Sequence, residues 1–144
     1  MIAPAHEQRK VQVWIHHQCP ACPTGSPLVL VLLTIEERGG FWQPVTGHVN
    51  ADETFEQAAL REAEEETGLP FQQPPNPLGL EIRFESPRGP VRERVFSLAP
   101  SFRDPVTLDP REHVGYRWLP PEAAGKLLRF ESNLNALKLL ARDW

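Results

Sequence analysis

Several short runs of the chain have the hydrophobic pattern of β-strands. Residues 11–15 alternate in character along the chain, which predicts a half-buried strand. Residues 28–33 form a continuous apolar run of leucine and valine, typical of a strand that is covered on both faces. A glycine pair at 39–40 predicts a turn. The remaining extended segments are expected at residues 41–45, 80–84, 91–98 and 114–119.

The clearest helix is predicted for residues 54–67. Thr54 and Gln57 have the spacing of a capping box, and Gly68 stands where a left-handed residue ends a helix. Two shorter helices are expected, one beginning near Pro121 and one at residues 133–142. Because strands and helices are interspersed without a repeat or a long linker, we expect residues 1–144 to form one α/β domain, with helices against a mixed sheet.

Composition narrows the function classes further. The chain has 144 residues, with 15 basic and 19 acidic side chains and a formal net charge of −4. This balance argues against a nucleic acid polymer as a partner, but it permits a small anionic substrate where cations neutralise it locally. There is no apolar run long enough to cross a bilayer and no signal-peptide pattern, so a cytoplasmic protein without membrane contact is expected. The oligomeric state does not follow from the sequence.

The predicted helix ends in an acidic cluster that opposes its stability. At about 100° per residue, one helix face carries apolar or small side chains first and carboxylates afterwards; it comprises Phe55, Ala58, Ala59, Glu62, Glu65 and Glu66. The carboxylates repel one another and meet the negative end of the helix dipole. A solvated acidic helix end is one interpretation. The other is a site for a divalent cation such as Mg²⁺, which would reverse each unfavourable effect.

The segment that contains this helix resembles a known motif. Residues 47–69, GHVNADETFEQAALREAEEETGL, are similar to the Nudix box, G-x5-E-x7-R-E-U-x-E-E-x-G-U, with Ala63 as the one departure at an aliphatic position. The resemblance implies a Nudix α/β/α sandwich with a central mixed β-sheet. It also implies hydrolysis of a phosphoanhydride bond in a nucleoside di- or triphosphate-type substrate, with Mg²⁺ or, as a substitute, Mn²⁺.

The same resemblance implies roles for individual residues. Glu62, Glu65 and Glu66 would be metal ligands. Glu53 and Arg61 would pair and brace the loop against the helix, and Gly47 would permit a tight turn. We expect a carboxylate to deprotonate the attacking water, with Glu65 as the first choice and Glu112 as the alternative.

Further segments are similar to the dihydroneopterin triphosphate pyrophosphatase branch of this family. They are FWQPVTG at 41–47, EHVGYRWL at 112–119 and Ser132-Asn133. This similarity implies Glu93 as an additional metal ligand. The branch carries a basic, phosphate-binding residue at the position of Ile35, which cannot serve here. Phosphate contacts are therefore expected from Arg38, Arg92 or Arg94.

The substrate and several roles stay open at this point. Dihydroneopterin triphosphate, nucleoside triphosphates and dinucleoside polyphosphates all fit the motifs, and a non-catalytic nucleotide-sensing or scaffold domain is the alternative class. Thr46 is expected to donate to a phosphate, while Trp42 either flanks a ring of the substrate or packs in the core. The Cys19/Cys22 pair, preceded by His16 and His17, is interpreted as reduced surface thiols rather than a zinc site, since the ligands are too crowded in one loop.

Overall fold

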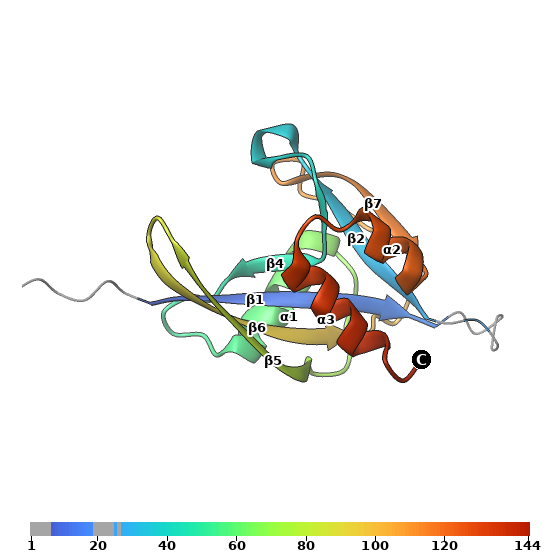
Figure 1. Cartoon of the computed structure of the whole chain (residues 1–144). Coiled ribbons are helices and arrows are strands. Elements are labelled where there is room, and N and C mark those ends of the chain that lie inside the picture. The colour runs from blue at the N-terminus through green and yellow to red at the C-terminus, as the bar shows by residue number, and fades with distance from the viewer. Residues whose placement is uncertain (1–6, 19–24, 26) are drawn as a thin grey trace, which may run out of the picture.

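The computed structural model describes residues 7–18, 25 and 27–144, and it has a mixed β-sheet with helices on both faces (Figure 1). The expected α/β/α sandwich is confirmed. Cys19 and Cys22 lie outside the described residues. The elements in chain order are β1 (Gln8–His17), β2 (Leu28–Thr34), η1 (Glu36–Arg38), β3 (Trp42–Gln43), β4 (Val45–His48), α1 (Phe55–Thr67), β5 (Asn76–Ser86), β6 (Gly89–Leu98), β7 (His113–Leu119), α2 (Pro121–Leu127) and α3 (Glu131–Ala141).

The predicted elements are present, but the extended segment expected at 41–45 is divided into β3 and β4, and several other elements differ in length. β1 extends beyond the predicted five residues at both ends, because its first residues pair with β6 and its last two, His16 and His17, pair with β2. β5 begins at Asn76, inside the proline-rich segment that we expected to be a loop. Asn76 and Pro77 lie opposite Ser97 and Phe96 of β6, and an irregularity in the pairing follows before Glu81. The prolines therefore end the regular ladder without preventing an extended conformation.

The sheet divides at β1. This strand runs parallel to β6 on one side, and on the other side it pairs with β4 and, at His16 and His17 alone, with β2. β1 and β2 then diverge. The consecutive strands β3 and β4 occupy the space between them, with β3 paired to β2 and β4 paired to β1. The divergence leaves room at the sheet for residues from α1 and from the start of β7 to approach each other.

Helix α1 packs closely on one face of the sheet. Its capping box is formed as predicted, with the Gln57 N–H donating to Thr54 Oγ1 at 3.1 Å and the Thr54 N–H donating to Gln57 Oε1 at 2.9 Å. Gly68 ends the helix in the left-handed conformation at φ 66°. Three fully buried alanines, Ala58, Ala59 and Ala63, bring the helix close to the sheet. Ala63, the departure from the Nudix pattern, is therefore part of this tight contact.

Helices α2 and α3 cover the opposite face, so that α1 and α3 lie on either side of β1 in Figure 1. Because side chains alternate along a strand, Val11, Val13 and Ile15 face α1, while Trp14 belongs to the cluster under α2 and α3. Among the described residues, no helix combines the length and apolar character that a membrane crossing needs.

Candidate active site

A polar cavity of about 270 Å³ lies where the C-terminal half of α1 meets the divided sheet. Its wall draws on six parts of the chain: β1, η1, the β3–β4 segment, the loop after β4, α1 and the start of β7. The lining residues are Lys10, Arg38, Gln43, Thr46, Gly47, His48, Asn50, Glu62, Glu66, Glu112 and His113. Glu62 and Glu66 of the helix thus face a cavity rather than open solvent.

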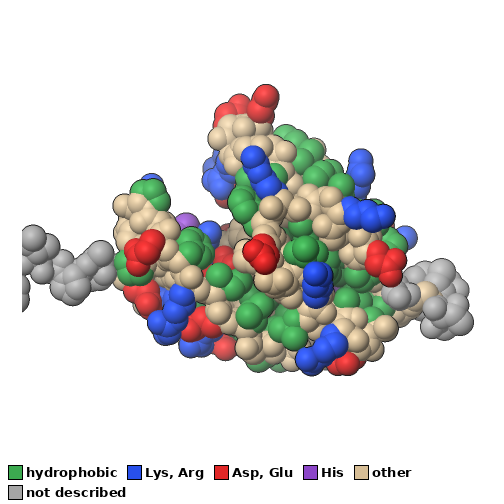
Figure 2. All heavy atoms as spheres, viewed as in Figure 1, with side chains coloured by type: hydrophobic (Ala, Val, Ile, Leu, Met, Phe, Trp, Pro, Cys, Tyr) green, Lys and Arg blue, Asp and Glu red, His purple; other side chains and the backbone are tan. Residues whose placement is uncertain are grey.

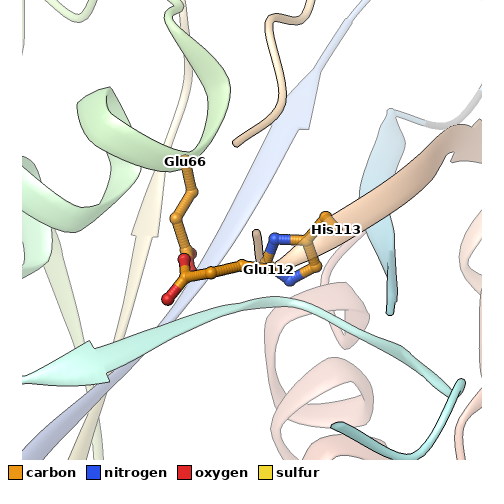
Figure 3. Close-up of side chains that lie close together, drawn as sticks. All are labelled: Glu66, Glu112 and His113. Atoms are coloured by element: carbon orange, nitrogen blue, oxygen red, sulfur yellow. The ribbon is translucent and has the colours of Figure 1, made fainter. Parts of the chain in front are cut away.

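Glu66 is the central acidic residue of this cavity. Only 4% of its surface is exposed, and its Oε2 has no hydrogen-bond partner among the described residues. Its ligand atoms lie within 4.8 Å of those of Glu112 and His113 (Figure 3). Burial, followed by the charges of Glu62 and Glu112, raises the pKa of Glu66 to about 10. The folded chain therefore holds several carboxylates together at a cost that a bound cation would remove.

The two neighbours of Glu66 contribute different groups. His113 is 2% exposed, its Nδ1 has no partner in the described part of the chain, and burial lowers its pKa, so the imidazole is neutral at pH 7. Its Nε2 lies 3.4 Å from Gln43 Nε2. Glu112 is partly exposed and forms an ion pair with Arg38 at 3.4 Å. A neutral imidazole and two carboxylates are a donor set that suits a divalent cation.

Arg61 connects the loop to the helix. Its Nε and Nη2 donate to the two carboxylate oxygens of Glu53 at 2.6 and 2.9 Å, and Nη2 also donates to the His48 carbonyl at 2.9 Å. Nη1 donates to Glu62 at 2.8 Å and to Glu65 at 3.2 Å. The expected pairing of Glu53 with Arg61 is therefore present. Since burial still raises the pKa of Glu62 despite this contact, Arg61 orients that carboxylate without fully stabilising its charge.

Gly47 has a different role from the expected tight turn. It lies within β4, and its φ is not among the positive values found in the chain. A Cβ atom at this position would overlap the carboxyl group and Cγ of Glu62. Glycine is required here because the Glu62 side chain crosses directly over the strand.

The structure brings together some of the predicted site residues and separates others. Glu62, Glu66, Thr46 and Arg38 line the acidic cavity. Glu65 does not; its side chain is 59% exposed and contacts Arg61 at the rim.

Three further predicted residues lie elsewhere. Arg92 and Arg94 lie over the ring of Phe55 and form ion pairs with Glu81. Both are therefore on the α1 face of the sheet, and neither lines the acidic cavity. Trp42 packs against the hydrophobic cluster beneath α2 and α3.

Glu93 is outside the acidic group because of strand alternation. It lies opposite Lys10 in the β1–β6 register, on the face of the sheet away from α1. Its carboxylate accepts a hydrogen bond from Gln12 Nε2 at 3.1 Å and lines a second cavity, of about 500 Å³. Glu112 takes the place near Glu66 that the resemblance assigned to Glu93.

Lys10 and His113 are among the cavity residues that were not singled out from the sequence. Lys10 lines both cavities, and so brings a cation to their junction. The signal for it is its position as a polar residue directly before the run 11–15, in which Val11, Val13 and Ile15 alternate on one face. His113 stood beside Glu112 in a segment that was noted only for its resemblance.

Comparisons with known proteins identify the family and related folds. The sequence profile of the NUDIX domain matches residues 22–142. The fold is similar to an Ap4A hydrolase of Caenorhabditis elegans in a binary complex, with 22% identity, coverage of 94% of this chain and 96% of that chain, and a TM-score of 0.77. It is also similar to the dihydroneopterin triphosphate pyrophosphohydrolase of Escherichia coli, with 26% identity, the same coverages and a TM-score of 0.74.

A shorter similarity connects the chain to a larger protein. Forty-one residues are 58% identical to part of an octanoyltransferase of Myxococcus xanthus; they make up 28% of this chain and 12% of that protein. The match thus spans about an eighth of that relative. The NUDIX profile, in contrast, covers most of the chain, and it includes both the helix that supplies Glu62 and Glu66 and the strand that begins at His113. The chain belongs to the Nudix hydrolase family.

Proposed function

We propose that this protein hydrolyses a phosphoanhydride bond in a small nucleoside triphosphate-type or pterin triphosphate-type substrate, with Mg²⁺ as the cofactor and Mn²⁺ as a substitute. The observation that carries the proposal is the buried, unpartnered Oε2 of Glu66 within 4.8 Å of Glu112 and His113. In a stable protein a buried polar atom without a partner is costly, so this one indicates a ligand that the carboxylates share.

The donor set fits a divalent cation. Glu62, Glu66 and Glu112 would hold it, with the neutral His113 beside them, and Glu65 remains a candidate ligand only if its side chain leaves Arg61. When bound, the cation neutralises phosphate oxygens and makes a water molecule more acidic. Chelation by carboxylates also removes the repulsion that raises the pKa of Glu66.

The chain's own residues would perform the remaining tasks. Lys10, Arg38 and Thr46 line the cavity; the two cations would contact the substrate's phosphates, and the Thr46 hydroxyl would donate to a phosphate oxygen. Glu112 is our candidate for the base that takes a proton from the attacking water, because it is partly exposed at the cavity, where it also forms an ion pair with Arg38. Glu65 was the first choice from sequence, but its contact with Arg61 directs it to the rim.

The test is hydrolysis of a panel of nucleoside triphosphates, diadenosine tetraphosphate and dihydroneopterin triphosphate, with Mg²⁺ or with EDTA. We expect turnover that depends on the metal and that is lost in Glu66→Gln. Glu64→Gln is the matched control, because Glu64 is on the same helix but exposed. Unchanged turnover in Glu66→Gln would show that the site is wrongly assigned.

The non-catalytic alternative is not favoured. A sensing or scaffold domain has no need for acidic residues that destabilise its fold, yet burial raises the pKa of both Glu62 and Glu66. A cytoplasmic location stays a prediction from the sequence.

A further inference from the structure

The second cavity has the character of a site for a flat ring. Its volume is about 500 Å³, within the usual range for small-ligand pockets. Phe41, Phe84 and Phe130 line it from three separate segments of the chain, and Phe84 and Phe130 are 43% and 46% exposed. Phe41 and Phe130 contact each other edge to face, with ring centroids 5.0 Å apart. Exposed aromatic faces around a cavity offer stacking surfaces for a heterocycle.

Glu93 is the one acidic residue on the wall of this cavity. It is 6% exposed, and burial raises the pKa of its carboxyl group. Gln12 donates to its Oε2 at 3.1 Å, and Gln12 is held in that orientation because its own Oε1 accepts from Trp14 Nε1 at 2.7 Å. Within the described part of the chain, no hydrogen bond to Glu93 Oε1 is formed. A fixed carboxylate oxygen is thus left to accept from a ligand.

The position of this carboxylate relative to the first cavity also matters. Lys10, Gln43 and Thr46 line both cavities, so the two adjoin. A ligand with its phosphates near Lys10 and the acidic cluster would extend its other end toward Glu93 and the phenylalanines. This orientation rests on the function proposed above.

We propose that Glu93 is a specificity-determining residue that accepts hydrogen bonds from adjacent ring N–H and amino groups of the substrate's heterocycle. The 2-amino-4-oxo-pyrimidine edge shared by guanine and the pterins offers this pair of donors. Hypoxanthine lacks the amino group, and adenine places a ring nitrogen acceptor beside its own. Uracil has carbonyl oxygens on both sides of its N–H, and those would face the carboxylate.

The size of the effect follows from the burial of the acceptor. Hydrogen bonds to a charged group contribute more than neutral ones, and a buried partner left without its donor is penalised. We therefore expect ligands with both donors to bind roughly 10- to 100-fold more tightly than analogues without the amino group.

The experiment measures binding to the metal-free full-length protein, by calorimetry in EDTA, with ligands that carry no phosphate. Guanosine is compared with inosine in one arm, and neopterin in the other with its 2-deamino analogue, which keeps the side chain and the ring N–H and has hydrogen in place of the amino group. A preference for the amino compound in either arm is expected, and the arm identifies the ring. Equal affinities in both arms would overturn the proposal.

Variants separate recognition from a structural role. Glu93→Gln keeps a carbonyl oxygen for Gln12 and presents an amide NH₂ to the cavity, so we expect the preference to disappear while the melting temperature and Mg²⁺ affinity stay near wild type. Glu85→Gln is the control, since Glu85 is exposed on the same hairpin. This variant should prefer the ligand with the amino group as strongly as the wild type does. Loss of Mg²⁺ affinity in Glu93→Gln would assign Glu93 to the metal and overturn the proposal.

The outcome distinguishes this inference from the proposed hydrolysis. Selective binding of guanosine or neopterin without turnover of any triphosphate would leave the recognition role standing and reject the hydrolytic function. Turnover without selective binding would do the reverse.

Discussion

Replacing Glu66 with glutamine should stabilise the metal-free protein while removing its response to Mg²⁺. The folded-state pKa of Glu66 is about 10, against 4.5 for a free glutamate side chain. Between these values the unfolded chain releases a proton that the folded chain retains, so the stability of the wild type falls as pH rises from about 4.5. Glutamine resembles the protonated form and does not titrate, so the variant escapes this loss.

The magnitude follows from the difference in pKa. At pH 7, which is about 2.5 units above the pKa of Glu66 in the unfolded chain, the folded chain still holds the proton. The wild type therefore loses at most about 3 kcal/mol of its free energy of unfolding between pH 4.5 and pH 7. For a chain of 144 residues, this predicts a rise in melting temperature of up to roughly 10 °C in EDTA. Mg²⁺ at about 100 times its Kd should increase the free energy of unfolding of the wild type by about 3 kcal/mol and leave that of the variant almost unchanged.

Thermal unfolding in EDTA and in Mg²⁺, with Glu64→Gln as the control, checks this reasoning. The control should melt close to the wild type and keep its Mg²⁺ response, because Glu64 is exposed. The reasoning is refuted if Glu66→Gln melts below the wild type in EDTA, or if Mg²⁺ raises its melting temperature as much as that of the wild type.

Three further outcomes are expected. Gly47→Ala should reduce kcat at least 10-fold with a modest change in melting temperature, because the added Cβ would displace the Glu62 side chain. Circular dichroism and a rate assay together check this, and a wild-type rate would contradict it. Mg²⁺ affinity, measured by calorimetry, should increase with pH between about 6 and 9. Because the pKa of Glu66 is raised, its carboxyl group is protonated in this range, and Mg²⁺ must displace a proton that is held less tightly as the pH rises. A flat profile would contradict the assignment. Lys10→Met should raise KM for a triphosphate about 10-fold while Arg92→Met leaves it unchanged, since only Lys10 lines the cavities; equal effects would argue against Lys10 as the phosphate contact.

The helix and its acidic cluster could be predicted from sequence because both depend on local spacing. The capping residues Thr54 and Gln57, the terminating Gly68 and the carboxylates one turn apart all lie within a single element. Helical periodicity places Glu62 and Glu66 on the same side without reference to the rest of the chain. The exposure of Glu65 was harder to predict, since it lies at the edge of that face, where Arg61 decides its orientation.

The position of Glu93 could not be predicted in the same way, because the side of the sheet it faces depends on the register between strands 80 residues apart. A shift of one residue between β1 and β6 would move Glu93 to the face of α1. Glu112 depends similarly on how the loop before β7 meets η1, where the Ile35 N–H donates to the Glu112 carbonyl at 3.0 Å. Sequence alone identified both glutamates as candidates but did not determine which of them approaches Glu66.

This division of the acidic residues between the two faces explains how one small domain could separate chemistry from recognition. The acidic residues of the first cavity come from α1 and from the start of β7, whereas Glu93 comes from β6 and lies in a cavity that β5 and α3 help to line. Since only Lys10, Gln43 and Thr46 belong to both cavities, we expect substitutions at Ile82 or Phe84 to change which heterocycle is accepted without moving the carboxylates. In Figure 2 the surface is hollowed between the tip of the β5–β6 hairpin and the segment around η1, which leaves that wall open to solvent. Changes in substrate preference should therefore arise on the hairpin side, and changes in rate on the α1 side.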